Sequence, residues 1–274
     1  MANGVGEIRN CFDRFDFSFF FDIIFLDTEG SFSMISKDVY AGYYTAPEFQ
    51  EAVSSIRGVI LVCGSCEQHG YHLPLDTDNI IGRELALRIA EKTNMLVMPP
   101  VNYGQVWSAK GFPGTISLPP SALKCILREI ICSLEQQQVK NIVLMSAHNG
   151  NYPILKDFAR EIRDEFGWTN IWHFPVAFSK ELEAKAQSAP AMMPHAGEAE
   201  TAMMLYLRPE LVHLDRAVRE YPVPPEDFAY RPRHWNEFVT SGSFGDPGIA
   251  TAEYGEALVE DVVHRISDLI NRLL

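Results

Sequence analysis

Short, uninterrupted apolar runs constrain the fold of this chain more than any other feature. Residues 58–63 read Gly-Val-Ile-Leu-Val-Cys, and residues 141–147 read Asn-Ile-Val-Leu-Met-Ser-Ala. Continuous runs of this length are typical of parallel strands that are buried on both faces. A third run covers residues 95–98, and residues 170–176 predict a further strand.

Helical patterns alternate with these runs. Residues 79–93 carry apolar side chains at helical spacing, and Pro120 stands near the first turn of a predicted helix over 119–138. The other predicted helices cover residues 47–55, 152–166, 196–207 and 252–274. Strands and helices that alternate with short connections predict an α/β fold with a mainly parallel sheet.

Composition narrows the class of protein. Of the 274 residues, 47% are hydrophobic and 22% are charged, which excludes a disordered or low-complexity chain and suffices for one large domain. The net charge of -13 argues against a nucleic acid or an anionic membrane as partner, because both require a basic face. Five cysteines without a framework spacing indicate a reducing compartment, so we expect a cytoplasmic location.

The N-terminal stretch differs from the rest of the chain. Residues 12–26 are rich in phenylalanine, but the run is too short to span a bilayer and is interrupted by Asp16 and Asp22. We predict that residues 1–36 are an extension and that residues 37–274 form the domain. Translation from an upstream start would explain residues 1–33, and an arm that packs on a neighbouring subunit is the alternative.

Residues with metal-binding chemistry follow the first strand. Glu67 and His69 are two apart, so in an extended chain their side chains point the same way, and Asp78 stands at the start of the next helix. Functional groups in open α/β sheets gather at the carboxyl ends of strands. Two carboxylates and an imidazole suit a divalent ion such as Zn, Mn or Fe.

Two further segments add candidate ligands. His148 follows the strand predicted over 141–147, and residues 194–200 read Pro-His-Ala-Gly-Glu-Ala-Glu. If this segment is helical, His195 and Glu198 share one face, whereas Glu200 points elsewhere. Because the three segments offer more ligands than one ion needs, two ions that share a bridging carboxylate are a hypothesis.

At these residues the chain resembles the creatininase (creatinine amidohydrolase) family. Residues 64–78 match its Gly-Ser-x-Glu-Gln-His-Gly-x-His-Leu-Pro-Leu-x-Thr-Asp motif almost throughout. Residues 112–118, 195–201 and 245–253 match further family motifs in the family order. The resemblance implies a three-layer α/β/α fold with a mainly parallel central sheet, two divalent ions per subunit, and a homo-oligomer, commonly a hexamer.

The resemblance also implies roles for individual residues. Glu67, His69, Asp78 and His148 match metal ligands, and Asp78 matches the carboxylate that bridges two ions. Creatininase has a ligand glutamate two residues after the histidine that matches His148, where this chain has Gly150, so we infer that Glu198 supplies the missing carboxylate.

Catalytic and substrate-contacting residues are predicted as well. We expect Glu198 and His195 to act in catalysis, and we expect His195 to be a proton shuttle because imidazole titrates near neutrality. The alternative role of His195 is to hold metal ligands in place through hydrogen bonds. His72 is expected to orient ligands through hydrogen bonds. Trp107 and Lys110 are candidates for substrate contact, and surface placement is equally open for them.

The expected activity is hydrolysis of a C–N bond in a small cyclic amide or formamide by a metal-activated water. A hydrolase that opens a cyclic polyol ketone and a non-catalytic relative that binds a metal or a small ligand are the alternatives. The chain has no glycine-rich or Walker motif, so no nucleotide cofactor is expected.

Overall fold

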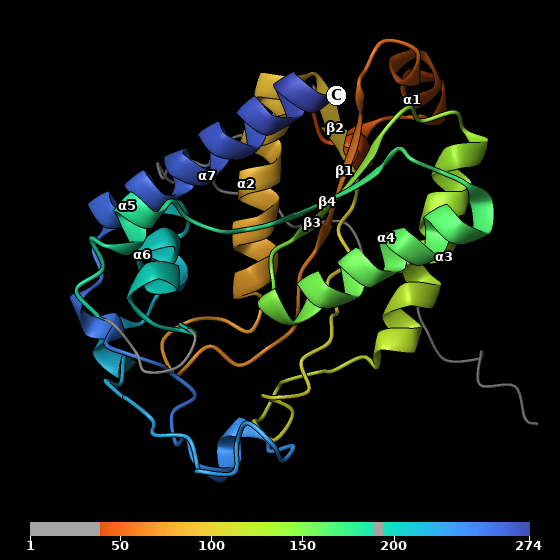
Figure 1. The fold of residues 1–274 in the computed structure, drawn as a ribbon. Helices are drawn as coiled ribbons and strands as arrows, with labels where there is room; N and C mark the ends of the chain where they lie inside the picture. The colour runs from red at the N-terminus through yellow and green to blue at the C-terminus, as the bar shows by residue number, and fades with distance from the viewer. Residues whose placement is uncertain (1–38, 189–193) are drawn as a thin grey trace, which may run out of the picture. The chain divides into compact units, whose positions relative to one another are not determined.

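The computed structural model describes residues 39–188 and 194–274, and its centre is a parallel four-stranded sheet (Figure 1). The strands lie in the order β2-β1-β3-β4. Their bounds are β1 Gly58–Cys63, β2 Met95–Val97, β3 Ile142–Ser146 and β4 Ile171–Pro175. Every pairing is parallel, so the predicted mainly parallel sheet is confirmed.

Helices cover both faces of this sheet. One face carries α2 (Thr77–Thr93), α5 (Lys180–Glu183), α6 (Glu198–Leu207) and α7 (Ala252–Leu273). The other face carries α1 (Ala46–Val53), α3 (Pro120–Gln136) and α4 (Tyr152–Phe166). Figure 1 shows the two helix layers on either side of the strands, and the predicted three-layer α/β/α fold is confirmed.

The buried strands explain why two cores form. In β1, Ile60 and Val62 pack with α2 and α7, whereas Val59 and Leu61 pack with α3 and α4. All six residues of β1 are buried, because successive side chains alternate between two faces that are both covered by helices. This double burial is the physical cause of the uninterrupted apolar run.

Short 3-10 turns connect several of these elements. Their bounds are η2 Ala41–Tyr43, η3 Asn149–Asn151, η4 Pro209–Leu211, η5 Leu214–Arg216, η6 Trp235–Glu237 and η7 Pro247–Ile249. Two of them, η3 and η6, lie next to the cavity described below.

The register of the sheet fixes where functional groups can meet. Cys63, the last residue of β1, pairs with Ser146, the last residue of β3, so the chain leaves both strands at the same edge. Helix α2 also passes close to this edge, since a Cβ on Gly82 would lie 2.5 Å from the Cβ of Ala147. The segments that carry Glu67 and His148 therefore start side by side.

The predictions for the N-terminal stretch fall outside the described residues. The extension over 1–36, its alternatives as an upstream start or an arm, and the domain boundary at residue 37 remain predictions. Within residues 39–188 and 194–274, none of the helices combines the length and the apolar character that a membrane span requires.

Candidate metal centre

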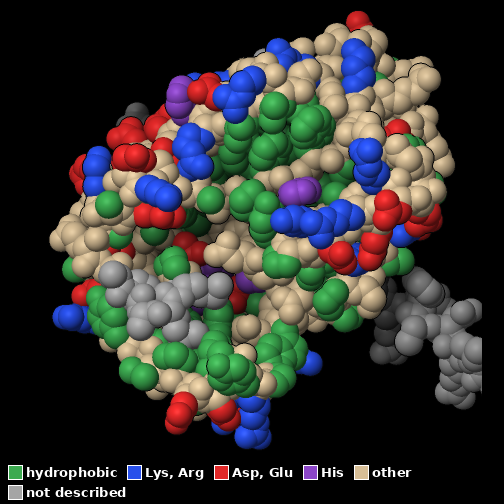
Figure 2. Space-filling view, in the orientation of Figure 1, with side chains coloured by type: hydrophobic (Ala, Val, Ile, Leu, Met, Phe, Trp, Pro, Cys, Tyr) green, Lys and Arg blue, Asp and Glu red, His purple; other side chains and the backbone are tan. Residues whose placement is uncertain are grey.

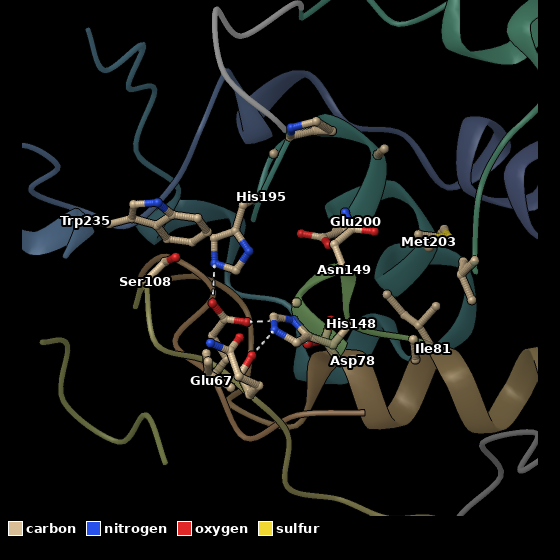
Figure 3. Close-up of a pocket in the computed structure, with 18 of the residues that line it drawn as sticks. Glu67, Asp78, Ile81, Ser108, His148, Asn149, His195, Glu200, Met203 and Trp235 are labelled. Carbon is tan, nitrogen blue, oxygen red and sulfur yellow. Dashed lines mark hydrogen bonds and ion pairs between the residues drawn. The ribbon is translucent and has the colours of Figure 1, made fainter. Parts of the chain in front are cut away.

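Six acidic and histidine side chains converge at the carboxyl edge of the sheet, and Figure 3 shows His148 and His195 directed toward Glu67. They come from the loop after β1, the start of α2, the loop after β3, and the segment that opens α6. These side chains are Glu67, His69, Asp78, His148, His195 and Glu200. Five are residues that the sequence analysis selected as ligands or catalytic groups, and Glu200 is the sixth.

One set of potential ligands consists of Glu67, Asp78 and His148, each of which offers an atom within 4.8 Å of the others. His148 Nδ1 lies 3.1 Å from Glu67 Oε2 and 3.2 Å from Asp78 Oδ2. Both carboxylates are buried. The set thus combines two carboxylate oxygens and one imidazole nitrogen, a donor set that divalent transition metals use.

A second set consists of His69, Asp78 and Glu200, again within 4.8 Å of one another. His69 Nε2 lies 3.4 Å from Asp78 Oδ1 and 3.9 Å from Glu200 Oε2. Asp78 therefore belongs to both sets and presents a different oxygen to each. This is the arrangement expected of a carboxylate that bridges two ions.

Hydrogen bonds from outside the two sets hold the imidazoles in place. His69 donates its Nδ1 hydrogen to the carbonyl of Glu67 at 3.1 Å, and His148 donates its Nε2 hydrogen to the carbonyl of Gln105 at 2.9 Å. A backbone carbonyl can only accept, so each ring directs its other nitrogen toward the carboxylates. Ser65 also donates its hydroxyl hydrogen to Asp78 Oδ2 at 2.6 Å.

Mutual charge stabilisation in the metal-free site is strong. Burial alone would lower the pKa of His69, but the Asp78 carboxylate outweighs it and raises this pKa to about 10. Burial opposes the charged form of His148 too, yet Glu67 and Asp78 raise its pKa well above the ordinary value. Conversely, burial would raise the pKa values of Glu67 and Asp78, whereas the neighbouring histidines lower both.

The residues fit divalent metal ions. Glu67 Oε2 and His69 Nε2 are buried, and among the described residues they form only the ion pairs given above and no further hydrogen bond. The ion pairs that Glu67 and Asp78 form within that part of the chain are all with histidines, so no lysine or arginine there compensates the carboxylates. The buried carboxylates therefore depend on protonated histidines for charge balance, and a bound divalent cation can take over that role when the rings give up their protons.

His195 lies beside the two sets. Its Nε2 lies 2.9 Å from the carbonyl oxygen of Gln68, 3.1 Å from the side-chain amide nitrogen of Gln68, and 3.8 Å from Glu67 Oε1. The ring also packs against Trp235, with 5.1 Å between the ring centroids. His195 forms a third group with Glu67 and His69, but it is already hydrogen-bonded at the nitrogen that faces Glu67.

The structure does not bring Glu198 to this site, in contrast to the sequence-based expectation. Its Oε2 accepts the backbone N–H of Ser188 at 2.7 Å, and Glu198 does not line the cavity. Glu198 was inferred from the family resemblance, and a helix over residues 194–200 would have put it on one face with His195, but Ala196 has a φ of 47° and Gly197 is extended, so α6 begins at Glu198. The carboxylate that reaches the site is Glu200, whose Oε2 also accepts the N–H of Ala196 at 2.5 Å.

The surroundings of Gly150 leave no room for the glutamate that creatininase has two residues after its matching histidine. A Cβ there would lie 2.5 Å from His148 Nε2 and 2.6 Å from the carbonyl oxygen of Gln105. Any larger residue would therefore disturb the hydrogen bond that orients His148. In this chain the second carboxylate of the His69 set comes instead from α6.

Other predicted residues have more distant roles. His72 Nε2 and Thr201 Oγ1 are 2.8 Å apart, which ties the first motif to α6 next to Glu200, and burial lowers the pKa of His72 to about 4. Trp107 lines the cavity, whereas Lys110 is exposed and does not line it.

A cavity of about 330 Å³ opens onto the two sets. Figure 2 shows acidic and histidine side chains at the bottom of a hollow on one face of the molecule. Trp235, which the sequence analysis did not select, forms part of the wall, and its backbone N–H donates to the carbonyl of Ser108 at 2.7 Å. No local sequence signal marks Trp235, because it approaches the site through the folding of a distant loop.

Comparisons with known proteins identify relatives of this chain. The family model for creatininase, described as creatinine amidohydrolase, matches residues 42–270. Creatinine amidohydrolase of Pseudomonas putida is 30% identical over 256 residues, which cover 86% of this chain and 97% of that protein. Mycofactocin precursor peptide peptidase of Mycolicibacterium smegmatis is 32% identical over 230 residues (80% and 86%). The 3-dehydro-scyllo-inosose hydrolase of Thermotoga maritima is 25% identical over 262 residues (86% and 84%).

Solved structures share the fold. A crystal structure of creatinine amidohydrolase superposes with a TM-score of 0.78 at 27% identity, covering 86% of this chain and 98% of that one. A creatininase variant of Zn-Zn type gives 0.77 at 27% identity, and a creatininase with Mn gives 0.75 at 29% identity, both with the same coverage. Because the family model matches most of the chain and the fold is shared with creatininase structures, the chain belongs to the creatininase family.

Proposed function

We propose that this protein is a two-metal hydrolase that cleaves the C–N bond of a small cyclic amide or formamide. The observation that carries the proposal is the position of Asp78, whose two oxygens face two separate sets of ligands. Glu67 and His148 would complete one set, and His69 and Glu200 the other. Solved creatininases of Zn-Zn type and with Mn support zinc or manganese as the ions, and iron remains a candidate from the donor set.

Divalent ions held in these sets would lower the pKa of a water molecule and polarise the carbonyl of the substrate. Hydrogen bonds within the chain would hold the metal ligands in fixed orientations. Ser65 and the carbonyls of Glu67 and Gln105 fix the ligand orientations, because each forms a hydrogen bond with a ligand side chain.

His195 is the candidate for the proton transfer that completes hydrolysis. A new C–O bond forms to the oxygen of water, the C–N bond breaks, and the departing nitrogen must receive a proton. His195 sits between Glu67 and Trp235 at the edge of the cavity, where its ring faces the substrate space. An imidazole in this place can move a proton from the water side to the leaving nitrogen.

The family resemblance also supports a homo-oligomer, commonly a hexamer, and the cysteine usage supports a cytoplasmic location. Light scattering of the purified protein tests the first proposal. A monomer at micromolar concentration would contradict it.

The test of the activity is metal removal and replacement. The metal-loaded protein is expected to hydrolyse a cyclic amide such as creatinine or a formamide, and the chelated protein to lose this activity and to regain it with Zn²⁺ or Mn²⁺. Hydrolysis of a cyclic polyol ketone alone would favour the alternative that the protein opens such a ring, in line with the inosose hydrolase relative. Full metal loading without turnover of any of these compounds would favour a non-catalytic binding protein.

A substitution tests the role of His195 separately. His195→Asn is expected to retain the metal and to lower kcat by about 100-fold or more, because general acid–base catalysis contributes about 10²–10⁴-fold. Loss of the metal from this variant would instead identify His195 as a ligand.

A further inference from the structure

We infer that the cavity selects uncharged substrates and holds an apolar acyl group against Ile81, Phe178 and Met203, with the leaving amine at the opposite end beside Trp235. This inference rests on the proposed hydrolase activity and narrows its substrate class to small amides whose carbonyl carries a carbon substituent, as in a cyclic amide, which a formamide lacks. It depends on the two ends of the cavity, on the charge of its walls, and on the position of His195.

The two ends of the cavity differ in chemistry. Figure 3 shows Trp235 and Ser108 on the side of His195, and Ile81 and Met203 on the other side, with Asp78 and His148 between. A planar amine can stack on an aromatic ring such as that of Trp235. The other end is lined by apolar side chains that carry no hydrogen-bonding group: Ile81, Val176, Phe178 and Met203.

The apolar end is built from the same helices as the ligands. Ile81 follows Asp78 by three residues on α2, and Met203 follows Glu200 by three residues on α6. Residues three apart are neighbours on one helix face, about 5–6 Å apart at Cβ. The wall therefore begins one helical turn beyond the ligands, which is where the substituent of a carbonyl positioned at the ligands would extend.

This wall is also firmly held. Ile81 and Met203 are 4% and 3% exposed and belong to the core on the α2 and α7 face of the sheet, and Phe178 packs against that core. A wall that is part of the core cannot easily rearrange around a polar group. Its size and apolar character therefore act as selection criteria.

The apolar end of the cavity offers no cationic partner to an anionic substituent. Among the described residues that line the cavity, none is lysine or arginine, and the acidic residues Glu67, Asp78 and Glu200 are the proposed metal ligands. A phosphate or carboxylate at the apolar end would be desolvated without a cationic partner, which is strongly unfavourable. The cavity of about 330 Å³ also limits the substrate to a small molecule or a short chain end.

The position of His195 sets the orientation of the substrate. When the C–N bond breaks and a C–O bond forms to water, the nitrogen takes up a proton, and His195 is the group placed to deliver it. Because His195 lies on the Trp235 side, the nitrogen must lie there too. The acyl carbon chain then extends toward Ile81 and Met203.

The test uses p-nitroanilides of acetic, butyric and succinic acid with the metal-loaded protein. The kcat/KM for the butyryl compound is expected to exceed that for the acetyl compound by about tenfold or more, because a methylene in an apolar pocket gives about 10–200-fold. The succinyl compound, which carries a carboxylate, is expected to be slower than the butyryl compound by at least the same factor. Equal rates for the succinyl and butyryl compounds would overturn the inference.

Met203 and Met204 provide a matched pair of variants. Both are buried in the same core, but Met203 lines the cavity and Met204 does not. Met203→Ala is expected to reduce the butyryl-to-acetyl ratio by about tenfold, whereas Met204→Ala leaves the ratio unchanged. Phe178→Ala, at a half-buried position, replaces Met203→Ala if that variant does not fold. Identical ratios in all variants would overturn the inference.

Binding without turnover separates this inference from the proposed function. Butyramide, but not succinamate, is expected to raise the Tm of the metal-loaded wild type, and the shift is expected to shrink in Met203→Ala but not in Met204→Ala. If this pattern appears without hydrolysis of any anilide, the cavity assignment stands and the proposed function fails. If hydrolysis occurs but butyramide and succinamate shift the Tm equally, the cavity assignment fails alone.

Discussion

Asp78 Oδ2 lies 3.2 Å from His148 Nδ1, so the first turn of α2 meets the loop after β3 at a single carboxylate oxygen. The other oxygen of Asp78 faces His69 at 3.4 Å. Asp78 is thus the residue through which the two sets of potential ligands are joined. A change at this residue should affect both sets at once.

Asp78→Asn is therefore expected to lose both metal ions and to lower activity by more than about 100-fold, because changes in groups around a metal site already cost about 10–100-fold. Metal analysis of the purified variant by mass spectrometry, together with kcat, checks this. Asp76→Asn, two residues earlier at an exposed position outside both sets, is the control and should keep its metal. Retention of two ions by Asp78→Asn would disprove the bridging role.

The glutamates of α6 give a second prediction. Glu200→Gln is expected to lose about one of the two ions, because an amide is a weaker ligand than a carboxylate in the His69 set. Glu198→Gln is expected to keep both ions, since Glu198 accepts a hydrogen bond from Ser188 instead. The reverse pattern of metal loss would restore Glu198 as the ligand.

Metal uptake is expected to release protons. In the metal-free site the carboxylates raise the pKa of His69 to about 10 and that of His148 well above its ordinary value, so both rings are protonated at pH 7. A metal binds the unprotonated nitrogen, so uptake at pH 7 should release about two protons, and the apparent affinity should increase as the pH rises.

Calorimetric titration with zinc in two buffers of different ionisation enthalpy measures this proton release. His69→Gln is expected to release about one proton fewer than the wild type, because its side chain does not titrate. A titration that releases no protons at pH 7 would show that the histidines are neutral before the metal arrives.

The same pKa shift predicts the stability of the metal-free protein. A raised folded-state pKa means that the His69–Asp78 pair stabilises the fold fully below about pH 6.5, the ordinary histidine value. This contribution is lost as the pH rises through about 10. Urea unfolding of the chelated protein at pH 6 and pH 10, compared with His69→Gln, measures it; an identical pH dependence in both would contradict the pairing.

The close packing of Gly82 predicts a link between helix position and metal binding. A Cβ there would lie 2.5 Å from the Cβ of Ala147 and 2.8 Å from Val62 Cγ1, and Ala147 directly precedes His148. Gly82→Ala is therefore expected to lower the free energy of unfolding by about 1–3 kcal/mol and to weaken metal affinity.

Gly167→Ala is the control for this prediction. Gly167 ends α4 with a φ of 73°, and a Cβ there would meet no atom within 4 Å. Its substitution is expected to cost about 1–2 kcal/mol of stability through backbone strain, without any change in metal affinity. Equal metal affinity in the two variants would show that the position of α2 does not influence the site.

The strands and most helices were predictable because their sequence patterns report burial directly. The run over 58–63 coincides with β1, and the pattern over 152–166 coincides with α4. The neighbouring positions of Glu67 and His148 also follow from strand ends that share one edge. These features depend on the local spacing of apolar residues and on the rule that functional groups of open α/β sheets gather at the carboxyl ends of the strands.

The choice between Glu198 and Glu200 was not predictable in the same way. It depends on whether the helix begins before or after residue 196, and the left-handed backbone of Ala196 decides this. An alanine in that conformation carries no sequence signal, since glycine or asparagine usually occupies it. Trp235 was missed for a related reason, because its place beside His195 is set by contacts distant in sequence.

Assembly of the site from widely separated segments has a consequence for how the protein matures. The Glu67, Asp78 and His148 set is encoded within the first 148 residues, whereas the His69 set needs Glu200, which α6 delivers. During synthesis the ligands of one ion are therefore complete some fifty residues before those of the other. A chain made only as far as residue 148 therefore contains one set of potential ligands in full and lacks a carboxylate of the other.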